Sequence, residues 1–208
     1  MTRIIAGVHG GRRLTAPAGA STRPTSDRVR EAFFSTLSTM TELAGARFAD
    51  LYAGSGAVGL EALSRGAGYV LLVESQPRAA RAIRGNMAAL GVGPAARLIT
   101  ADVRQVVSAA PPGGPFDVVF ADPPYALAAD ELSEVQHALV ANGWLAPDAV
   151  VAIERSTRAG SRVEARAGSP RGEARAGSGG DALTWVDGIT ADRSRRYGET
   201  TLWYGRRS

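Results

Sequence analysis

An Asp-Pro-Pro-Tyr tetrapeptide at residues 122–125 directly follows a predicted buried strand at residues 117–121. Proline fixes φ and has no amide donor, so this loop offers acceptors, namely the Asp122 carboxylate and the Pro123 carbonyl. Two convergent acceptors suit an exocyclic NH2 group on a planar heterocycle, because holding its protons leaves the nitrogen lone pair directed at a methyl group. Tyr125 would offer a π-face to the extruded base. The tetrapeptide therefore predicts methylation of a nucleobase amine, and the alternative is a proline-stiffened turn with Tyr125 in the core.

A glycine-rich segment lies upstream, where Gly54, Gly56 and Gly59 satisfy the G-x-G-x-x-G pattern. Glycines permit positive φ angles and let the backbone approach a ligand closely. Glu74 follows Gly54 by twenty positions, and a carboxylate there would accept hydrogen bonds from ribose hydroxyls. The pattern fits NAD and S-adenosyl-L-methionine (SAM) equally, or a tight turn without a ligand.

Asp50 separates the two cofactors. A dinucleotide places its pyrophosphate at the N-terminus of the helix that follows the loop, where a nearby carboxylate would repel it. SAM instead carries an ammonium and a sulfonium, which a carboxylate attracts. Asp102 lies where an acceptor for the adenine amino group is needed, although it also suits a helix N-cap. We expect a SAM site formed by Asp50, Tyr52, Gly54, Ser55, Gly56, Glu74, Asp102 and Val103.

Composition excludes several classes of function. The 208 residues include no cysteine and two histidines, His9 and His137. The lack of cysteine excludes a disulfide scaffold, a thiolate zinc site and an iron–sulfur cluster, and we expect no metal. No apolar run approaches the ~18 residues of a membrane span, and residues 1–12 lack the apolar core of a signal peptide. We therefore expect a cytoplasmic protein with no membrane partner.

Positive charge is concentrated at the two ends of the chain. All 24 basic residues are arginine. Residues 1–30 carry a net charge of +5 and residues 193–208 a net charge of +4, whereas residues 31–192 carry −5. The arginine fork matches phosphates and base edges, so the distribution favours a nucleic-acid partner. The alternative is a general preference for arginine with solvated termini.

The order of predicted elements indicates an α/β fold. Apolar runs at residues 47–51, 69–74, 97–100, 118–121 and 150–154 predict strands, and residues 58–65, 77–90 and 131–141 predict helices. This alternation predicts a doubly wound parallel sheet covered on both faces. N-terminal to these elements, residues 3–8 and 12–16 predict a hairpin. Ser26 is then predicted to be the N-cap of a helix. Residues 183–186 and 200–204 predict a final antiparallel pair of strands at the sheet edge. The repetitive residues 155–182 predict a flexible surface insertion.

With both motifs placed, the chain resembles the class I SAM-dependent methyltransferases, and among them the amino-methyltransferases marked by (Asn/Asp)-Pro-Pro-(Tyr/Phe). It is most similar to the RsmD family, which methylates the N2 amine of one guanine, guanine 966, in 16S ribosomal RNA. The resemblance also runs through residues 3–7, 11–12, 23–31, 51–62 and 142–145. The segment at 23–31, Arg-Pro-Thr-Ser-Asp-Arg-Val-Arg-Glu, is its most family-specific part.

The resemblance implies a Rossmann-like fold with a mostly parallel, seven-stranded sheet whose last strand is reversed. It implies an RNA-facing hairpin and helix extension at residues 1–45 and a methyltransferase domain at 46–208. SAM would be the cofactor, and Asp122, Pro123 and Tyr125 the catalytic residues. The partner would be 16S rRNA in the small ribosomal subunit or in an assembly intermediate, bound by a monomer. Our candidate RNA contacts are Arg12, Arg23, Arg28 and Arg30.

Three other functions share part of this pattern. A DNA amino-methyltransferase acting on adenine N6 or cytosine N4 would use the same chemistry but lacks the segment at 23–31. A nicotinamide oxidoreductase would share the glycine pattern and would be stabilised by NAD rather than SAM. A non-catalytic RNA-binding protein would bind RNA without responding to SAM.

Overall fold

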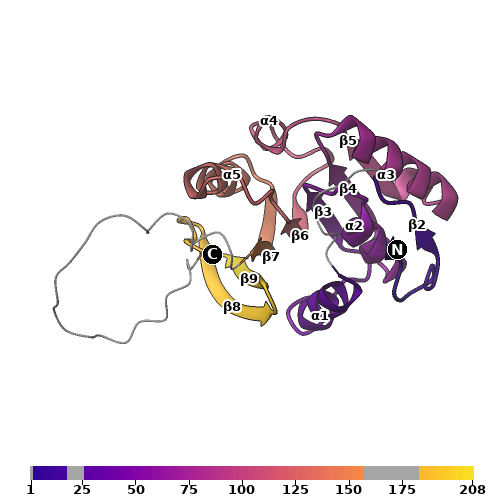
Figure 1. Ribbon diagram of the computed structural model, residues 1–208. Helices are drawn as coiled ribbons and strands as arrows, with labels where there is room; N and C mark the ends of the chain where they lie inside the picture. Colours follow the sequence, from indigo (N-terminus) through magenta and orange to yellow (C-terminus); the bar gives the residue numbers. More distant parts are fainter. Residues whose placement is uncertain (1, 18–25, 157–182) are drawn as a thin grey trace, which may run out of the picture.

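The computed structural model describes residues 2–17, 26–156 and 183–208, and its centre is a seven-stranded sheet (Figure 1). The strand order is β5-β4-β3-β6-β7-β9-β8, with β9 antiparallel to both of its neighbours and the other pairs parallel. The expected Rossmann-like sheet with a reversed last strand is confirmed. The strands are β3 (Arg47–Leu51), β4 (Tyr69–Val73), β5 (Ala96–Ile99), β6 (Phe116–Ala121), β7 (Leu145–Ser156), β8 (Ile189–Tyr197) and β9 (Thr200–Arg207).

Helices cover both faces of this sheet. In Figure 1 the sheet is seen along its strands, with α4 and α5 on one face and α1, α2 and α3 on the other. Alternate residues of the central strands β3, β4, β6 and β7 therefore enter two separate cores. The helices are α1 (Asp27–Leu37), α2 (Ala57–Ser64), α3 (Pro77–Leu90), α4 (Val103–Val107) and α5 (Ala129–Ala141), with a short 3-10 turn at Gly93–Ala95.

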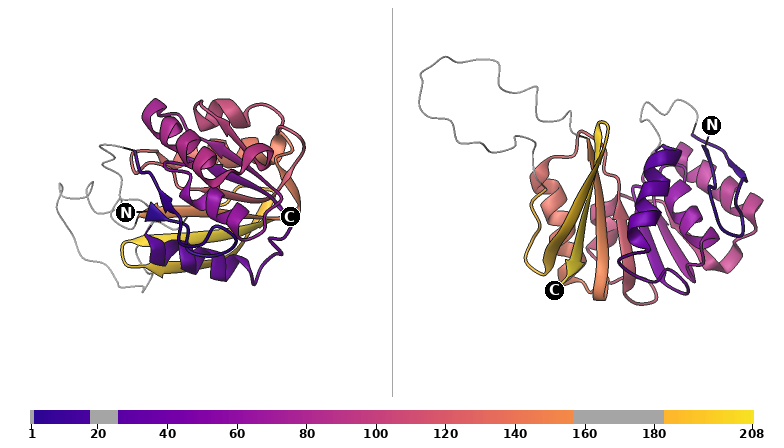
Figure 2. Two further views of the ribbon diagram at one scale, coloured as in Figure 1. Left: turned by 90° about the vertical axis from the view of Figure 1, so that its right-hand side faces the viewer. Right: turned by 90° about the horizontal axis from the view of Figure 1, so that it is seen from below.

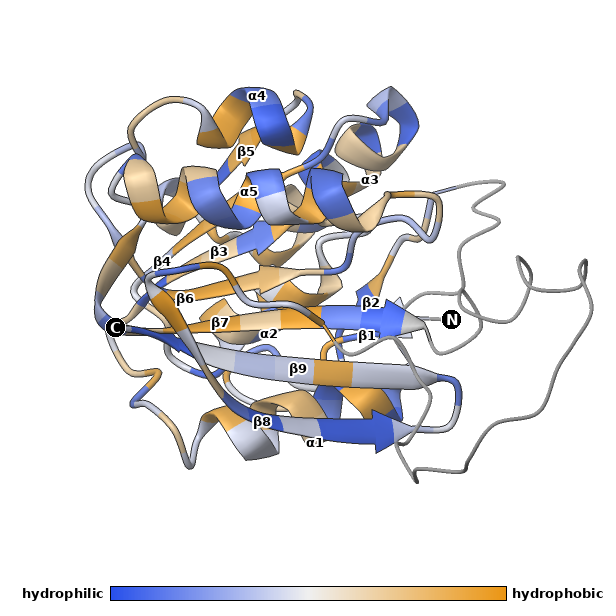
Figure 3. Cartoon of the chain, turned by 90° about the vertical axis from the view of Figure 1, so that its left-hand side faces the viewer, coloured by the Kyte–Doolittle hydropathy of each residue, from blue (hydrophilic) through white to orange (hydrophobic). Residues whose placement is uncertain are grey.

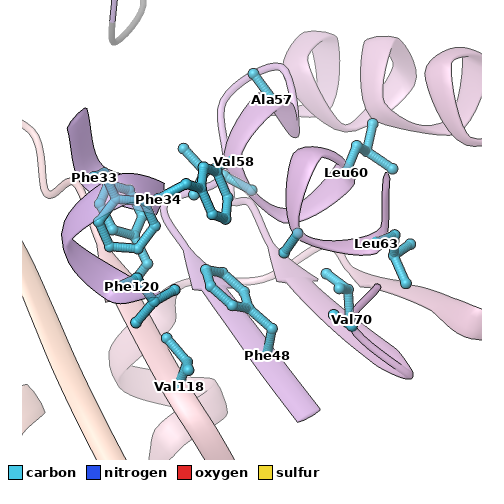
Figure 4. Packing of buried hydrophobic residues seen from close by; sticks show 14 of the residues in the cluster. Phe33, Phe34, Phe48, Ala57, Val58, Leu60, Leu63, Val70, Val118 and Phe120 are labelled. Atoms are coloured by element: carbon cyan, nitrogen blue, oxygen red, sulfur yellow. The ribbon is translucent and has the colours of Figure 1, made fainter. Parts of the chain in front are cut away.

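Helix α1 is fastened to the sheet by aromatic packing. Phe33 lies 4.9 Å from Phe34 and 4.9 Å from Phe120 of β6, measured between ring centroids, and Phe48 of β3 completes the group (Figure 4). Edge-to-face and tilted contacts at this spacing add to the area burial of the rings. Ser26 caps the helix by accepting a hydrogen bond from the Val29 amide, as predicted. The helix at the N-terminal side of the chain therefore shares a core with the sheet.

The N-terminal hairpin is present, but it is shorter than predicted. Strands β1 (Thr2–Arg3) and β2 (Arg13–Leu14) pair antiparallel. The ladder stops because the amides of Ile5 and Ala6 donate to the Glu61 carboxylate of α2, at 2.7 and 2.9 Å. These contacts attach the hairpin to α2, and in Figure 2 (right) the hairpin, drawn in indigo, lies on the side of the molecule away from β8 and β9.

The prediction of a strand at residues 183–186 is wrong. These residues are irregular, and the Ile189 amide closes a turn by donating to the Val186 carbonyl at 3.1 Å. The edge strand is instead β8, whose residues are mostly polar and exposed. The antiparallel pair at the sheet edge is confirmed. The predicted flexible insertion at 155–182 falls largely outside the described residues, and Arg155 and Ser156 belong to β7.

No helix within the described ranges is long and apolar enough to cross a membrane.

Candidate active site

The glycine loop and the tetrapeptide meet at the carboxyl edge of two neighbouring central strands. Leu51 of β3 is in register with Ala121 of β6, and the Asp122 amide donates to the Leu51 carbonyl at 3.4 Å. The strand order reverses its direction at β3, because β4 lies on one side of it and β6 on the other. Such a switch point is where open α/β sheets bind ligands.

Two carboxylates hold the glycine loop in place. Glu74, which follows β4, accepts a hydrogen bond from the Gly54 amide, and Asp50 accepts one from the Gly59 amide, both at 2.8 Å. Glu74 also accepts from the Gln76 amide at 2.7 Å. Both acidic side chains are buried. The loop conformation is therefore determined by the two strand ends on which it rests.

The glycines of the loop have different structural roles. A Cβ on Gly59 would lie 2.9 Å from Val70, so this residue permits close packing of α2 on the sheet. Gly54 has a positive φ of 58°, and a Cβ there would meet no atom within 4 Å. Gly56 also has positive φ and begins α2, while Ser55 beside it is buried. The open space at Gly54 is where a ligand can approach the backbone.

Asp50 stabilises the start of α2 from the end of β3. The N-cap of α2 is Gly56, which has no side chain to accept a helix amide, and the Asp50 carboxylate takes that position toward Gly59. Burial raises the pKa of Asp50 to about 7, the Gly59 hydrogen bond opposes this shift, and the charges of Asp122 and Glu74 add to it. This concentration of negative charge favours a cationic ligand.

Tyr52 directly follows β3, and Asp102 lies between β5 and α4. Tyr52 has a positive φ of 64°, an unusual conformation for a residue with a side chain, and burial followed by the charge of Asp102 raises its pKa to about 12. Asp102 caps α4 by accepting from the Arg104 amide at 2.9 Å, so the N-cap interpretation is confirmed. Its side chain remains 56% exposed, so a ligand can still reach it. Val103 is buried in the core.

The tetrapeptide forms a turn directly after the C-terminal end of β6. Asp122 is half-buried, Pro123 is buried, and the Pro124 carbonyl accepts from the Leu127 amide at 2.9 Å. Tyr125 is 58% exposed, so the alternative that placed it in the core is wrong. This exposure allows a planar group to stack on the ring.

Arg155 supports the chain segment after the tetrapeptide, a role that the sequence did not suggest. Both of its terminal nitrogens donate to the Leu127 carbonyl, each at 3.4 Å. Arg155 lies near the end of β7, next to β6 in the sheet. No motif marks this residue, because its partner is a backbone carbonyl distant in sequence.

Asn86 is a second residue that sequence reasoning missed. It lies in α3 and is buried, and its side chain donates to the Ser55 carbonyl at 3.0 Å. It also pairs with the backbone of Thr15 through two hydrogen bonds, at 2.8 and 3.0 Å. The available signal was an amide placed between Ile83 and Leu90 on the apolar face of a helix.

The candidate RNA contacts occupy different environments. Arg12 and Arg28 are exposed, and Arg23 lies outside the described residues. Arg30 is fully buried, donates to the Arg3 carbonyl and pairs with Asp27 at 3.0 Å. A guanidinium in the interior cannot reach a phosphate, so we correct the assignment of Arg30 from an RNA contact to a structural residue. Across residues 2–17, 26–156 and 183–208, no three His, Asp or Glu side chains are grouped to hold a metal ion.

Comparison with known proteins places the chain among methyltransferases. A family model described as "Conserved hypothetical protein 95" matches residues 2–169. The chain is 38% identical over 158 residues to "Ribosomal RNA small subunit methyltransferase D" of Escherichia coli, covering 76% of each protein. It is 35% identical over 154 residues to the protein of the same name from Haemophilus influenzae, covering 73% of this chain and 77% of that one. The solved structure of "Putative methyltransferase yhhF from Escherichia coli" superposes with a TM-score of 0.77 at 30% identity, over 100% of this chain and 98% of that chain.

Proposed function

Because the chain belongs to the RsmD family, whose model is described as "Conserved hypothetical protein 95", we propose that it is a SAM-dependent ribosomal RNA methyltransferase. Its substrate would be the exocyclic N2 amine of one guanine in 16S rRNA. The names of the E. coli and H. influenzae relatives support a small-subunit rRNA substrate. The observation that carries the proposal is the contact between the Asp122 amide and the Leu51 carbonyl, since it joins the amine-binding tetrapeptide to the glycine loop.

The residues around the glycine loop fit SAM. Burial raises the pKa of Asp50 to about 7, and the charges of Asp122 and Glu74 add to this shift. A pyrophosphate would be repelled here, whereas an ammonium and a sulfonium would relieve the repulsion. Open space beside Gly54 admits the ligand. Exposed Asp102 would accept from the adenine amino group, and Glu74 from the ribose hydroxyls.

The reaction exchanges one carbon–sulfur bond for one carbon–nitrogen bond. Bound SAM supplies an electrophilic methyl group whose bonding electron pair returns to sulfur on transfer. The Asp122 carboxylate and the Pro123 carbonyl would accept hydrogen bonds from the two N2 protons, so that the lone pair points at the methyl carbon. These acceptors also stabilise the positive charge that develops on nitrogen. The amine then releases one proton, which Asp122 or water accepts.

Tyr125 would hold the target base in position. The residue is 58% exposed, and stacking of a base on an exposed aromatic ring contributes about 1–3 kcal/mol. Correct orientation of the amine supplies much of the rate, because ~7–11 kcal/mol is available from a near-attack geometry. The tyrosine therefore contributes through positioning.

The N-terminal extension, residues 1–45, would face the RNA, and residues 46–208 would carry the methyltransferase chemistry. Exposed Arg12 and Arg28 would neutralise phosphates. A monomer would act in the cytoplasm, where small subunits assemble.

The proposal is tested with small ribosomal subunits from cells that lack this protein. Purified protein and methyl-labelled SAM are incubated with these subunits, with naked 16S rRNA or with duplex DNA, and the modified nucleotide is mapped. We expect one N2-methylguanine in 16S rRNA. Labelling of adenine N6 or cytosine N4 in DNA would contradict the proposal, as would no labelling of any of the three.

A further inference from the structure

The β8–β9 hairpin, residues 189–207, forms a strongly basic ribbon at the edge of the seven-stranded sheet. This ribbon has no role in the site described above. Strand β8 is the outermost strand, and seven successive residues of it, 190–196, are exposed. A strand covered by a helix on one face would alternate between buried and exposed positions. Both faces of β8 are therefore open to solvent along most of its length. Figure 3 shows its C-terminal half as strongly hydrophilic.

The C-terminal half of β8 lies at the same end of the strands as the tetrapeptide. Strand β8 runs parallel to β6, because β9 is antiparallel to both β7 and β8. The arrowheads of β7 and β8 accordingly point the same way in Figure 3. Along the register, Ala121 pairs with Ile153, Ile153 with Trp203, and Trp203 with Ser194. The next residues along the chain are Asp122, directly after β6, and Arg195 in β8.

Arg195 and Arg196 are therefore level with the candidate active site. Three strand steps separate β6 from β8, which amounts to ~14 Å at the usual spacing between strands. This distance is too long for contact with the target base and suits contact with the RNA strand beside it.

The two arginines face opposite sides of the ribbon. Arg195 pairs with Leu202, on the face of β9 where Tyr204 packs against Phe33 of α1. Arg196 pairs with Thr201, and Thr201 pairs with Arg155 of β7. Arg196 and Arg155 thus lie in one row on the opposite face, and Arg155 reaches the Leu127 carbonyl just after Tyr125. Basic side chains therefore extend from the tetrapeptide loop to the sheet edge.

Ion pairs with Asp192 form at one end of the β8–β9 hairpin. Asp192 forms ion pairs with Arg193 at 2.8 Å and with Arg206 at 3.3 Å. Among the residues that the structure describes, no ion pair includes Arg195 or Arg196. Charges on an edge strand also prevent edge-to-edge aggregation. That purpose does not require Arg195 and Arg196 to lie at the end nearest the active site.

From this placement we propose that Arg195 and Arg196 bind the phosphate backbone of the rRNA strand that flanks the target nucleotide. The inference rests on the proposed function and adds a second RNA contact, across the active site from the N-terminal extension. Phosphate contacts fix the register of a nucleic acid without reading its sequence. The β8–β9 hairpin would thus hold the strand while the tetrapeptide receives the extruded base.

The test removes both charges with Arg195→Thr/Arg196→Thr, because threonine is well tolerated in strands. We expect the affinity for 16S rRNA to fall about tenfold. We also expect the slope of log K against log salt to fall by about 1.4, since each lost phosphate contact on a single strand accounts for ~0.7. KM for RNA should rise while kcat and SAM affinity stay unchanged.

Two matched variants separate a specific contact from a change in net charge. Arg81→Ala/Arg97→Thr removes two exposed arginines from α3 and β5, at the opposite edge of the sheet, and should leave RNA binding unchanged. Arg195→Lys/Arg196→Lys keeps both charges and should keep most of the affinity. If the double threonine variant unfolds, the single Arg195→Thr variant serves the same purpose.

Failure of this inference is distinguishable from failure of the proposed function. If wild-type protein methylates 16S rRNA and the double threonine variant binds RNA with wild-type affinity and slope, the ribbon is not an RNA contact. If the variant loses affinity for assembled subunits but not for naked rRNA, the ribbon contacts a ribosomal protein, and the inference is also overturned. If wild-type protein itself does not methylate rRNA, the proposed function fails first.

Discussion

The side-chain amide of Asn86 donates a hydrogen bond to the carbonyl oxygen of Ser55 at 3.0 Å. Ser55 belongs to the glycine loop, and the same Asn86 side chain pairs with the backbone of Thr15 in the N-terminal segment. One buried amide therefore joins the loop that would hold SAM to the extension that would face RNA. Removal of this side chain would therefore affect both segments.

Asn86→Ala should weaken both the fold and the cofactor site. The substitution leaves the buried Ser55 carbonyl without this partner, which costs about 1–3 kcal/mol, and it also removes both hydrogen bonds to the exposed Thr15. We expect a lower free energy of unfolding in urea and weaker SAM binding by calorimetry. Ala88→Ser, at an exposed position of the same helix, is the control. Wild-type SAM affinity in a destabilised Asn86→Ala protein would separate the loop from this contact.

Asp50 should make stability depend on pH. Burial raises its pKa to about 7 from the usual 3.8, so between these values the folded chain binds more protons than the unfolded chain. The stability that neutral Asp50 contributes is full below about pH 4 and is lost as the pH rises toward 7, by at most ~1.4 kcal/mol per pH unit. Urea unfolding at several pH values measures this slope.

Cofactor affinity should change with pH in the opposite direction. Cationic SAM favours the ionised Asp50 carboxylate, so binding should strengthen as the pH rises toward 7 and should release a proton. Asp50→Asn retains an oxygen for the Gly59 amide and removes the charge, so it should bind SAM more weakly and without proton release. Calorimetry in buffers of different ionisation enthalpy measures the proton. Equal proton release by wild type and variant would assign the titration to another group.

The parallel half of the sheet was predictable because its strands are buried on both faces. Residues 69–73 and 116–121 are almost continuously apolar, as expected for strands between two helical layers. Strand β8 was missed for the opposite reason: neither of its faces is covered, so no hydrophobic pattern marks it. The apolar residues at 183–186 supported a strand, but they form an irregular segment before the turn at Gly188.

The site could be predicted in its composition but not in its connections. The glycine pattern and the tetrapeptide located both loops, and the parallel topology brought them together. The hydrogen bond from Gly59 to Asp50 depends on how closely α2 packs on the sheet, which spacing alone does not reveal. Arg30 was predicted to contact RNA because charge was counted along the chain, whereas helix α1 turns this residue inward.

Asp122→Ala should abolish methyl transfer while SAM binding remains nearly unchanged. The substitution removes one of two acceptors for the target amine, and losing one such group in a preorganised site costs about 10²–10³ in kcat. Methylation of small subunits is measured under single-turnover conditions, alongside SAM titration. Glu134→Ala, which removes an exposed carboxylate from α5, controls for the change in charge. A wild-type rate in Asp122→Ala would remove this residue from the mechanism.

Arg12 and Arg28 should differ from Arg30 in what their removal changes. Arg12→Ala/Arg28→Ala deletes two exposed charges, so RNA binding should weaken and its salt dependence flatten, while the free energy of unfolding stays within about 0.5 kcal/mol of wild type. An unchanged salt slope would exclude these two residues from the interface.

Arg30→Ala instead removes a buried side chain that donates to the Arg3 carbonyl and pairs with Asp27. We expect it to lower the free energy of unfolding by about 2–4 kcal/mol, and any RNA-binding defect should follow the loss of folded protein. A stable Arg30→Ala variant with a flattened salt slope would restore Arg30 as an RNA contact, because the helix would then have to turn in the complex.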